Sequence, residues 1–522
     1  MKYLLFTFAA IISLNCKSQT FLRSELTTSL STPWEIVYGP DNYLWLTESG
    51  GRISRIDPTI GTKTVVYTAS DYYGGSALEQ STLCSQPNIG SGTLGMTLHP
   101  DFLNIGSSYI YFVYSYNNGT TSAPDTRFKI VRLTWDQGTS SVIANTDLVT
   151  QLPNGYDHLG GRLLSVKQGT NCCLFLSCGD NGISEVNGPT CYANQANNPN
   201  NFTQDVNYKN GKIHRFNIDG TIPADNPIPG NSFYTRGHRN PQGLAYNTSQ
   251  NVLYDIEHGD RTDDEINVLV SGMNYGWKNV KGYHADNNFP GESAYISGYT
   301  PHPSIAGDAL KEPMYSWCAT SQPTVSNYLD WCTVAPSGAA YYSSNAIPNW
   351  NNSLLVTTLK NGTTTDQEVY RFKLNANGLG IAPSTTTNPN PERYFGNDQA
   401  LNGRLRDIAI SPDGTKIYLI NNGGASSDKI TVYTFDASGI NDIHAFYSKI
   451  KLYPNPAENS IQIDTDLLIE KVEIINQLGQ SIQVRNSENK NLDVSMLNPG
   501  VYTVKIFFKE TNIACSKKIV KL

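Results

Sequence analysis

The chain has 522 residues, enough for a large domain followed by a smaller one. Charged residues make up only 16% of it, the formal net charge is -7, and no long run of Lys or Arg is present. Nucleic acid and anionic membrane surfaces are therefore poor candidate partners. The abundance of Gly, Asn, Ser, Thr and Tyr predicts a loop-rich, all-β protein, because aromatic and β-branched side chains suit pleated surfaces.

The beginning of the chain has the form of an export signal. Lys2 precedes an apolar run that ends near Leu14, and this run is too short to span a bilayer. We therefore expect residues 1–19 to be a signal peptide and the mature protein to be exported, with no transmembrane segment. Nine cysteines fit an oxidising compartment, and the favoured disulfide joins Cys318 to Cys332.

A strand–turn–strand unit recurs between the beginning of the chain and about residue 435. Each copy has a hydrophobic strand, a turn rich in Gly, Pro, Asp or Asn, and a second hydrophobic strand. The first strands of the six copies are 36–38, 94–98, 162–166, 243–246, 339–342 and 407–410. This repeat predicts a six-bladed β-propeller over residues 20–440, with one small sheet per blade. A β-sandwich with similar hairpins is the alternative, but sandwiches do not usually need so long a chain.

The character of the sequence changes after Phe435. Short alternating strands follow, among them 461–463 and 472–475, and they predict a small C-terminal β-sandwich over residues 449–522. This segment resembles the C-terminal sorting domain of the type IX secretion system of Bacteroidetes. The resemblance implies contact with the secretion machinery. It also implies export through the periplasm of a Gram-negative bacterium, to a secreted or cell-surface location.

A histidine beside a carboxylate precedes the third repeat unit. Asp157 and His158 lie in a Gly-rich loop directly before the strand 162–166. A positioned histidine is a natural proton acceptor, and a carboxylate can orient it or support its charged form. A satisfied surface histidine is the alternative, and this motif alone favours that alternative.

Basic and amide side chains gather at matching ends of several repeat units. This group consists of Arg236, His238, Arg239, Asn240, Gln242, Lys360, Arg404 and Arg406. Any one of the basic residues is more readily explained as part of a surface ion pair. In a propeller, however, matching ends converge on the axis. Several inward cations need a compensating anion, and a small ligand with several carboxylates would serve.

The segment 257–267 is acidic and rich in oxygen ligands. Calcium prefers carboxylate and backbone carbonyl oxygens, which this segment offers, although the spacing is not that of an EF-hand. A solvated acidic turn is the alternative, and the spacing alone does not exclude it.

Taken together, these motifs resemble those of the soluble quinoprotein glucose dehydrogenases. The motifs are 157–163, 239–243, 262–267, 274–277, 333–336, 359–360 and 404–407, in the order of that family. The resemblance spans most of residues 30–435. It implies oxidation of an aldose sugar at C1 to the lactone, with pyrroloquinoline quinone (PQQ) and Ca²⁺ as cofactors and an external electron acceptor.

The resemblance also assigns roles to individual residues. His158 would be the general base, supported by Asp157, and Gly259 and Asp260 would offer backbone carbonyls to calcium. The residues implied in cofactor binding are Arg239, Asn240, Lys360, Thr333, Arg404, Arg406 and Tyr328. Trp331 would contact the sugar.

Three departures from the family pattern concern the substrate and the metal. Gly90 and Glu185 stand where the family has glutamines, and Asp260 replaces a proline whose carbonyl binds the metal. The cofactor site is thus retained while the sugar pocket differs, so an aldose is a safer expectation than glucose. Two alternatives remain open: a calcium-dependent propeller lactonase, and a non-catalytic propeller that binds glycans or proteins.

Overall fold

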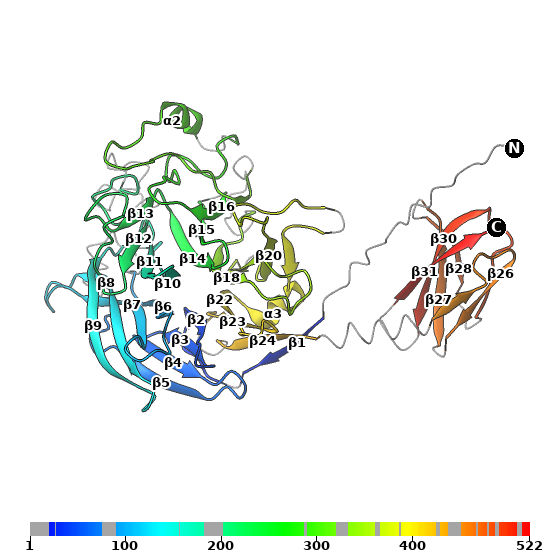
Figure 1. Cartoon of the computed structure of the whole chain (residues 1–522), viewed down its shortest axis with the longest axis horizontal. Helices are drawn as coiled ribbons and strands as arrows, with labels where there is room; N and C mark the ends of the chain where they lie inside the picture. The colour runs from blue at the N-terminus through cyan, green and yellow to red at the C-terminus, as the bar shows by residue number, and fades with distance from the viewer. Residues whose placement is uncertain are drawn as a thin grey trace. The chain divides into compact units, whose positions relative to one another are not determined.

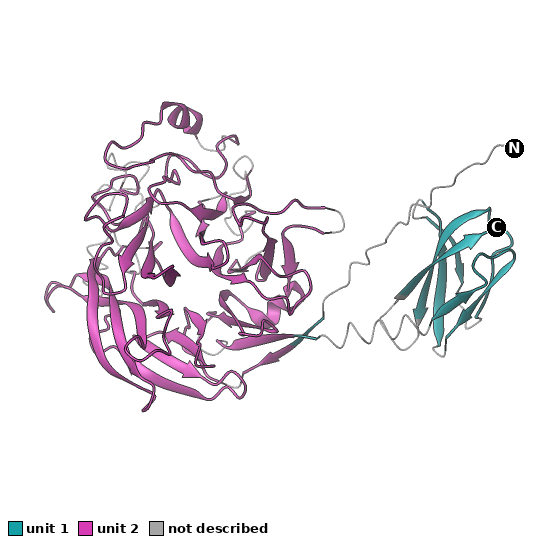
Figure 2. Ribbon diagram, viewed as in Figure 1, with its two compact units in different colours: residues 1–22, 435–522 teal, residues 23–434 magenta. Residues whose placement is uncertain are grey.

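The protein is described here by a computed structural model, and its strands confirm the all-β class. The described residues are 20–26, 28–75, 90–155, 157–181, 202–260, 262–286, 290–319, 332–360, 366–385, 388–423, 428–436, 450–465, 468–477, 480–485, 490–508 and 514–522. Two compact units are distinguished: residues 23–434 form one, and residues 435–522 with the beginning of the chain form the other (Figure 2).

In the larger unit, the described strands form four-stranded antiparallel sheets around a common centre (Figure 1). The first three sheets in chain order contain β2 (Ile36–Tyr38), β3 (Leu44–Glu48), β4 (Arg52–Ile56) and β5 (Lys63–Thr68); β6 (Thr93–Leu98), β7 (Tyr109–Asn117), β8 (Thr126–Asp136) and β9 (Ser141–Leu152); and β10 (Gly160–Gln168), β11 (Asn171–Cys178), β12 (Lys212–Asn217) and β13 (Phe233–Arg236). The next two contain β14 (Asn240–Asn247), β15 (Val252–His258), β16 (Asp264–Leu269) and β17 (Tyr315–Trp317); and β18 (Pro336–Tyr342), β19 (Ser353–Thr358), β20 (Val369–Lys373) and β21 (Glu392–Tyr394).

A further sheet joins the two ends of this unit. Its strands are β1 (Phe21–Glu25), β22 (Leu405–Ile410), β23 (Lys416–Asn421) and β24 (Ile430–Phe435), in the order β1-β24-β23-β22. The Leu26 N–H donates to the Ile430 carbonyl at 3.0 Å, next to this pairing. The ring of sheets is therefore closed by hydrogen bonds between segments about four hundred residues apart in sequence. Helices are few and short among the described residues: α2 (Glu292–Gly298), α3 (Gln399–Asn402) and the 3-10 turn η2 (Gly396–Asp398).

The hydrophobic core lies between neighbouring sheets. Tyr254 and Ile266, from one sheet, pack with Leu354 and Phe372 of the next in a single buried cluster. Because both faces of an inner strand are covered, strands such as β6, β16 and β19 are buried at every position. Full burial of a Val, Leu, Ile, Phe or Met side chain in these strands contributes roughly 1.5–3 kcal/mol.

β-Bulges interrupt the strands nearest the centre. β6, β10, β14, β18 and β22 each show a register shift close to their first residues. The shifted segments contain Arg162, Gln242, Ser337 and Arg406. A bulge bends the strand and re-aims a side chain that the regular pleat would direct elsewhere. The bulges therefore set the directions of the polar side chains at the centre.

The smaller unit consists of two antiparallel sheets with a shared core. One sheet contains β25 (Lys451–Tyr453), β26 (Ser460–Asp464) and β29 (Asn491–Asp493), and the other contains β27 (Ile469–Ile475), β28 (Ser481–Arg485), β30 (Gly500–Phe508) and β31 (Ala514–Lys521). Ile461 and Leu492 from the first sheet are buried with Val472 and Val504 from the second.

Two further predictions are tested by the fold. Cys318 and Cys332 form a disulfide, as the sequence predicts. Within the described ranges, none of the helices is long and apolar enough to cross a membrane.

Candidate active site

The candidate general base is fixed by a buried carboxylate. His158 lies in the loop before β10, and its Nδ1 is 2.8 Å from Oδ1 of Asp180, the second residue after β11. Oδ2 of Asp180 accepts a hydrogen bond of 2.8 Å from the indole N–H of Trp277. Asp180 is fully buried, so the carboxylate is held from both sides. When Nδ1–H donates to Asp180, the lone pair of the imidazole lies on Nε2, the tautomer that a general base requires.

A glycine allows this close approach. A Cβ atom at Gly179 would lie 1.9 Å from the carbonyl oxygen of His158, closer than any real contact. His158 itself has a φ of +49°, in the left-handed region that side chains rarely adopt. The Asn181 N–H donates to the His158 carbonyl at 3.2 Å and helps to hold this conformation. The loop is therefore built to bring the imidazole onto Asp180.

Asp157, the carboxylate expected to support His158, is placed differently. Its side chain is 61% exposed, and Oδ2 is 3.9 Å from Nε2 of His158. Oδ1 accepts the His158 backbone N–H at 2.8 Å. Asp180 thus makes the shorter contact with the imidazole, and sequence reasoning missed it. A carboxylate just after a buried strand, at the end nearest the centre, is the signal that points to it.

Arg239 is anchored through its main chain. Its N–H donates to Oε2 of Glu257 at 2.9 Å, and its carbonyl accepts the Asp180 N–H at 2.7 Å. The guanidinium donates to the His258 carbonyl at 3.3 Å and lies 5.5 Å from the Trp277 ring. These contacts place a buried cation beside the His158–Asp180 pair.

Gln242 connects two of the residues predicted to bind the cofactor. Its Nε2 donates to Oδ1 of Asn240 at 2.7 Å, and its Oε1 accepts from the guanidinium of Arg406 at 2.7 Å. Its backbone carbonyl accepts from Nε of Arg162 at 2.8 Å. In the sequence Gln242 is one member of a polar cluster, whereas in the structure it is the bridge between β14 and β22.

Arg162 is neutralised by the protein itself. Its guanidinium pairs with Oε1 of Glu35 at 2.7 Å and with Oδ2 of Asp407 at 2.9 Å. The same guanidinium lies 4.4 Å from the centre of the Trp34 ring. Arg162 therefore has a structural role among the innermost strands, and its charge is already balanced.

Arg406 differs from Arg162 in this respect. Its guanidinium also lies 4.4 Å from the centre of the Trp34 ring, and burial, with the charges of Arg162 and Arg404, lowers its pKa to about 9. Within the described ranges no carboxylate forms an ion pair with Arg406, and its buried Nε has no hydrogen-bond partner. Arg406 is thus a buried cation that needs an anion.

The candidate metal loop lines a small cleft. Residues around this cleft include Arg239, Glu257, His258, Gly259, Asp260, Trp277 and Lys281. The Asp260 carboxylate accepts from Nζ of Lys281 at 2.7 Å. The backbone carbonyls of Gly259 and Asp260 are the metal ligands that the sequence predicts. A Cβ at Gly259 would lie 2.0 Å from the Thr262 carbonyl oxygen, so the loop is tightly folded.

Asp264 joins this loop to the segment that contains Thr333. Its carboxylate accepts the N–H groups of Gly259, Val334 and Ala335 at 2.9, 2.7 and 2.8 Å. Burial raises the pKa of Asp264 to about 6. Asp264 is a second residue whose role the sequence did not reveal, although its motif was recognised.

The other expected site residues are distributed as follows. Thr333 is half-buried, and the next residue, Val334, accepts the Lys360 N–H at 3.3 Å, so these two segments are adjacent. The Arg404 guanidinium donates to Oδ1 of Asn422 at 3.0 Å. Tyr328 and Trp331 lie outside the described residues.

The expected substrate positions are only partly described. Glu185 lies outside the described residues. A Cβ at Gly90 would lie 2.6 Å from Leu159 and 2.7 Å from the Gly155 carbonyl oxygen. The backbone therefore leaves no room for a glutamine at Gly90 in this conformation.

Comparisons with known proteins found relatives for both parts of the chain. The glucose/sorbosone dehydrogenase model matches residues 30–430, and that of a secretion system C-terminal sorting domain matches residues 451–521. Quinoprotein glucose dehydrogenase B of Acinetobacter calcoaceticus is 30% identical over 453 residues, covering 79% of this chain and 88% of the relative.

Solved structures show the same fold. The PQQ-bound aldose sugar dehydrogenase of Streptomyces coelicolor has a TM-score of 0.54 and 22% identity, covering 80% of this chain and 99% of that one. The apo-form aldose sugar dehydrogenase of Escherichia coli has a TM-score of 0.56 and 25% identity, covering 80% and 100%. By the extent of the family match, the chain belongs to the glucose/sorbosone dehydrogenase family and carries a C-terminal sorting domain.

Proposed function

We propose that the protein oxidises an aldose sugar at C1 to the lactone, using PQQ and calcium. The observation that carries this proposal is the His158–Asp180 pair beside a group of buried cations. Relatives named quinoprotein glucose dehydrogenase and PQQ-bound aldose sugar dehydrogenase support the choice of cofactor.

The described residues fit a cofactor with several carboxylates. Among the described residues Arg406 is buried without a paired carboxylate, and the Gln242 bridge connects it to Asn240, which follows Arg239 in the chain. An anion would balance the Arg406 charge and satisfy its Nε. We assign PQQ binding to Arg239, Asn240, Arg406 and the predicted residues Thr333, Lys360, Arg404 and Tyr328.

We place calcium at the backbone carbonyls of Gly259 and Asp260. The Asp260 carboxylate is engaged by Lys281, and the loop is held by the Asp264 carboxylate. Oxygen ligands from a tight loop beside the cleft suit a hard cation, which would act as a Lewis acid there.

The residues of this chain supply proton transfer and orientation. Nε2 of His158 takes the proton of the anomeric hydroxyl, and Asp180 stabilises the resulting imidazolium through Nδ1–H. The Trp277 N–H keeps the Asp180 carboxylate from rotating away. When bound, PQQ supplies the two-electron acceptor for the hydride that leaves C1.

We infer the architecture and location that accompany this activity. The larger domain, residues 20–440, is a six-bladed β-propeller, and residues 449–522 form a β-sandwich that addresses the protein to type IX secretion. Residues 1–19 are a signal peptide, and the protein is secreted or held at the cell surface. The glycine at position 90, which leaves no room for a glutamine, supports proposing an aldose as the substrate and not glucose in particular.

The alternatives make different demands on the centre of the propeller. A lactonase would present carboxylates and Asn to a central calcium, whereas the buried charge at Arg406 is positive and unpaired by a carboxylate among the described residues. A non-catalytic binding propeller would have no use for an imidazole fixed in one tautomer by a buried carboxylate.

Anaerobic mixing of aldoses with the PQQ- and calcium-loaded protein tests the proposal. We expect the absorbance of the bound cofactor to change to that of its reduced form, and His158→Ala to bind the cofactor without being reduced. His284→Ala, which alters a histidine outside the cleft, is the matched control and should behave as the wild type. Failure of the wild type to bind PQQ would reject the proposal.

A further inference from the structure

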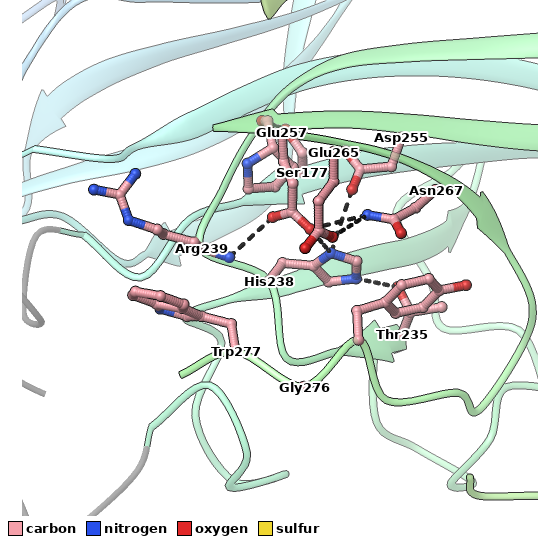
Figure 3. A network of polar contacts seen from close by, with 12 residues as sticks. Ser177, Thr235, His238, Arg239, Asp255, Glu257, Glu265, Asn267, Gly276 and Trp277 are labelled. Carbon is pink, nitrogen blue, oxygen red and sulfur yellow. Dashed lines mark hydrogen bonds and ion pairs between the residues drawn. The ribbon is translucent and has the colours of Figure 1, made fainter. Parts of the chain in front are cut away.

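A second cluster of ionisable groups lies beside the cofactor cleft but outside the proposed chemistry. His238 precedes β14, and Asp255 and Glu257 are both on β15. Nδ1 of His238 is 3.3 Å from Oδ2 of Asp255 and 3.2 Å from Oε1 of Glu257 (Figure 3). One ligand atom from each residue lies within 4.8 Å of the other two. All three side chains are buried, and His238 and Asp255 are fully so.

Hydrogen bonding does not explain this geometry well. Charge-assisted hydrogen bonds between an imidazole and a carboxylate are about 2.7–2.9 Å long, shorter than both contacts. A single Nδ1 proton could serve both carboxylates only as a weaker three-centre hydrogen bond. Ligands about 2.0–2.1 Å from a tetrahedral metal ion are separated from one another by about 3.3–3.4 Å, close to the two observed distances.

Asp255 provides a second, independent observation. Neither of its fully buried carboxylate oxygens has a hydrogen-bond partner of good geometry; the polar groups nearby are His238 at 3.3 Å and the Asn267 amide. An unsatisfied buried carboxylate is costly unless a cation compensates it.

The surroundings of His238 resemble the outer shell of a metal ligand. Nε2 of His238 is 2.8 Å from the Thr235 hydroxyl, and the ring stacks on Tyr275 at 4.7 Å. The Asn267 amide donates to Oε1 of Glu257 at 3.1 Å. Such partners fix the orientation of ligating imidazole and carboxylate groups.

We propose that His238, Asp255 and Glu257 bind one divalent transition-metal ion, of which zinc is the best example. One imidazole with two carboxylates suits Zn²⁺, Mn²⁺ or Fe²⁺, whereas calcium and magnesium prefer oxygen ligands alone. This ion is separate from the calcium proposed at Gly259 and Asp260, and its existence does not depend on the proposed reaction.

The ion would stabilise the main chain next to the proposed active site. It would tie the loop before β14 to β15, and the second oxygen of Glu257 accepts the Arg239 N–H at 2.9 Å. The Arg239 carbonyl in turn accepts the Asp180 N–H. A structural ion at this place would therefore fix the main chain between the general base and the cofactor cleft.

Metal content of the full-length holoprotein tests the proposal. We expect protein produced with added zinc, and then dialysed against calcium-containing, zinc-free buffer, to retain on the order of one zinc ion per chain. Asp255→Asn and His238→Gln should each lose it. Asp308→Asn is the matched control, because Asp308 is a buried carboxylate paired with Arg236 and should leave the zinc content unchanged.

X-ray absorption at the zinc edge keeps the test valid if the variants do not fold. In the wild type we expect nitrogen and oxygen ligand atoms at about 2.0–2.2 Å from the zinc ion. Zinc retained equally by folded Asp255→Asn would show binding elsewhere and overturn the proposal. Wild-type protein that takes up none of zinc, manganese or iron, and whose His238 carries protons on both ring nitrogens by ¹⁵N NMR, would overturn it as well.

Discussion

Replacing Asp180 by Asn tests which of two carboxylates, Asp180 or Asp157, supports His158 as the general base. The substitution keeps the size of the side chain but removes the charge that receives two 2.8 Å hydrogen bonds. If the new amide oxygen accepts from Trp277, the amide N–H faces Nδ1 of His158 and drives its proton onto Nε2. The imidazole then no longer offers a lone pair to the sugar.

The expected loss follows from these contacts. General-base catalysis contributes about 10²–10⁴-fold, and a hydrogen bond to a charged group contributes about 1.5–3 kcal/mol. We therefore expect kcat of Asp180→Asn to fall by about 10²–10⁴-fold, with PQQ affinity little changed. Steady-state dye reduction gives kcat, and titration of the apoprotein with PQQ gives the affinity.

Asp157→Asn is the matched control for this prediction. Its carboxylate is 61% exposed, and an Asn oxygen can still accept the His158 N–H. We expect a change in kcat of less than about 3-fold, in line with the small worth of exposed ion pairs. A severe loss in Asp157→Asn together with near-normal turnover in Asp180→Asn would refute the assignment to Asp180 and restore the sequence-based expectation.

Three further predictions concern binding and stability. Gln242→Leu removes the hydrogen-bond acceptor of Arg406 and leaves buried polar groups unpaired, at a cost of about 1–3 kcal/mol. PQQ binding should therefore weaken by about 10- to 100-fold. An unchanged affinity in the apoprotein titration would contradict this. Burial lowers the pKa of His214 to about 3, so between pH 6.5 and 3 only the unfolded chain binds a proton at this histidine. The free energy of unfolding, measured with urea, should therefore fall as the pH drops, by up to about 1.4 kcal/mol per pH unit. In His214→Asn it should fall less steeply, and an equal slope would contradict this prediction. Gly259→Ala should raise the calcium concentration needed for half-maximal turnover by more than about 10-fold, because its Cβ clashes with a neighbouring carbonyl. Asp260→Ala should change this concentration by less than about 3-fold, since the backbone carbonyl ligand survives the substitution. Equal effects of the two variants would argue against carbonyl ligation.

Much of the fold could be predicted from local patterns in the sequence. The predicted hairpin that begins at 162–166 is the antiparallel pair β10–β11, and the one that begins at 339–342 is β18–β19. The Cys318–Cys332 disulfide was also predictable, because its two cysteines bracket one short loop. Hydrophobic strands and turn residues are local signals, which a single sequence displays directly.

The features that were missed depend on long-range contacts. β1 completes a sheet with β24, and nothing in its own five residues indicates that partner. Asp180 reaches His158 across neighbouring strands, and Gln242 reaches Arg406 from a different sheet. The bulges that aim these side chains also leave little trace in the hydrophobic pattern, because they shift the register by a single position.

The most direct test of the account is dye reduction by the purified apoprotein, with PQQ and calcium added back together or singly and an aldose panel as substrate. We predict turnover that requires both additions and the sugar, and that His158→Ala abolishes while still binding PQQ. Turnover independent of PQQ, or binding of PQQ without turnover of any aldose, would contradict the claim that this cleft oxidises sugars.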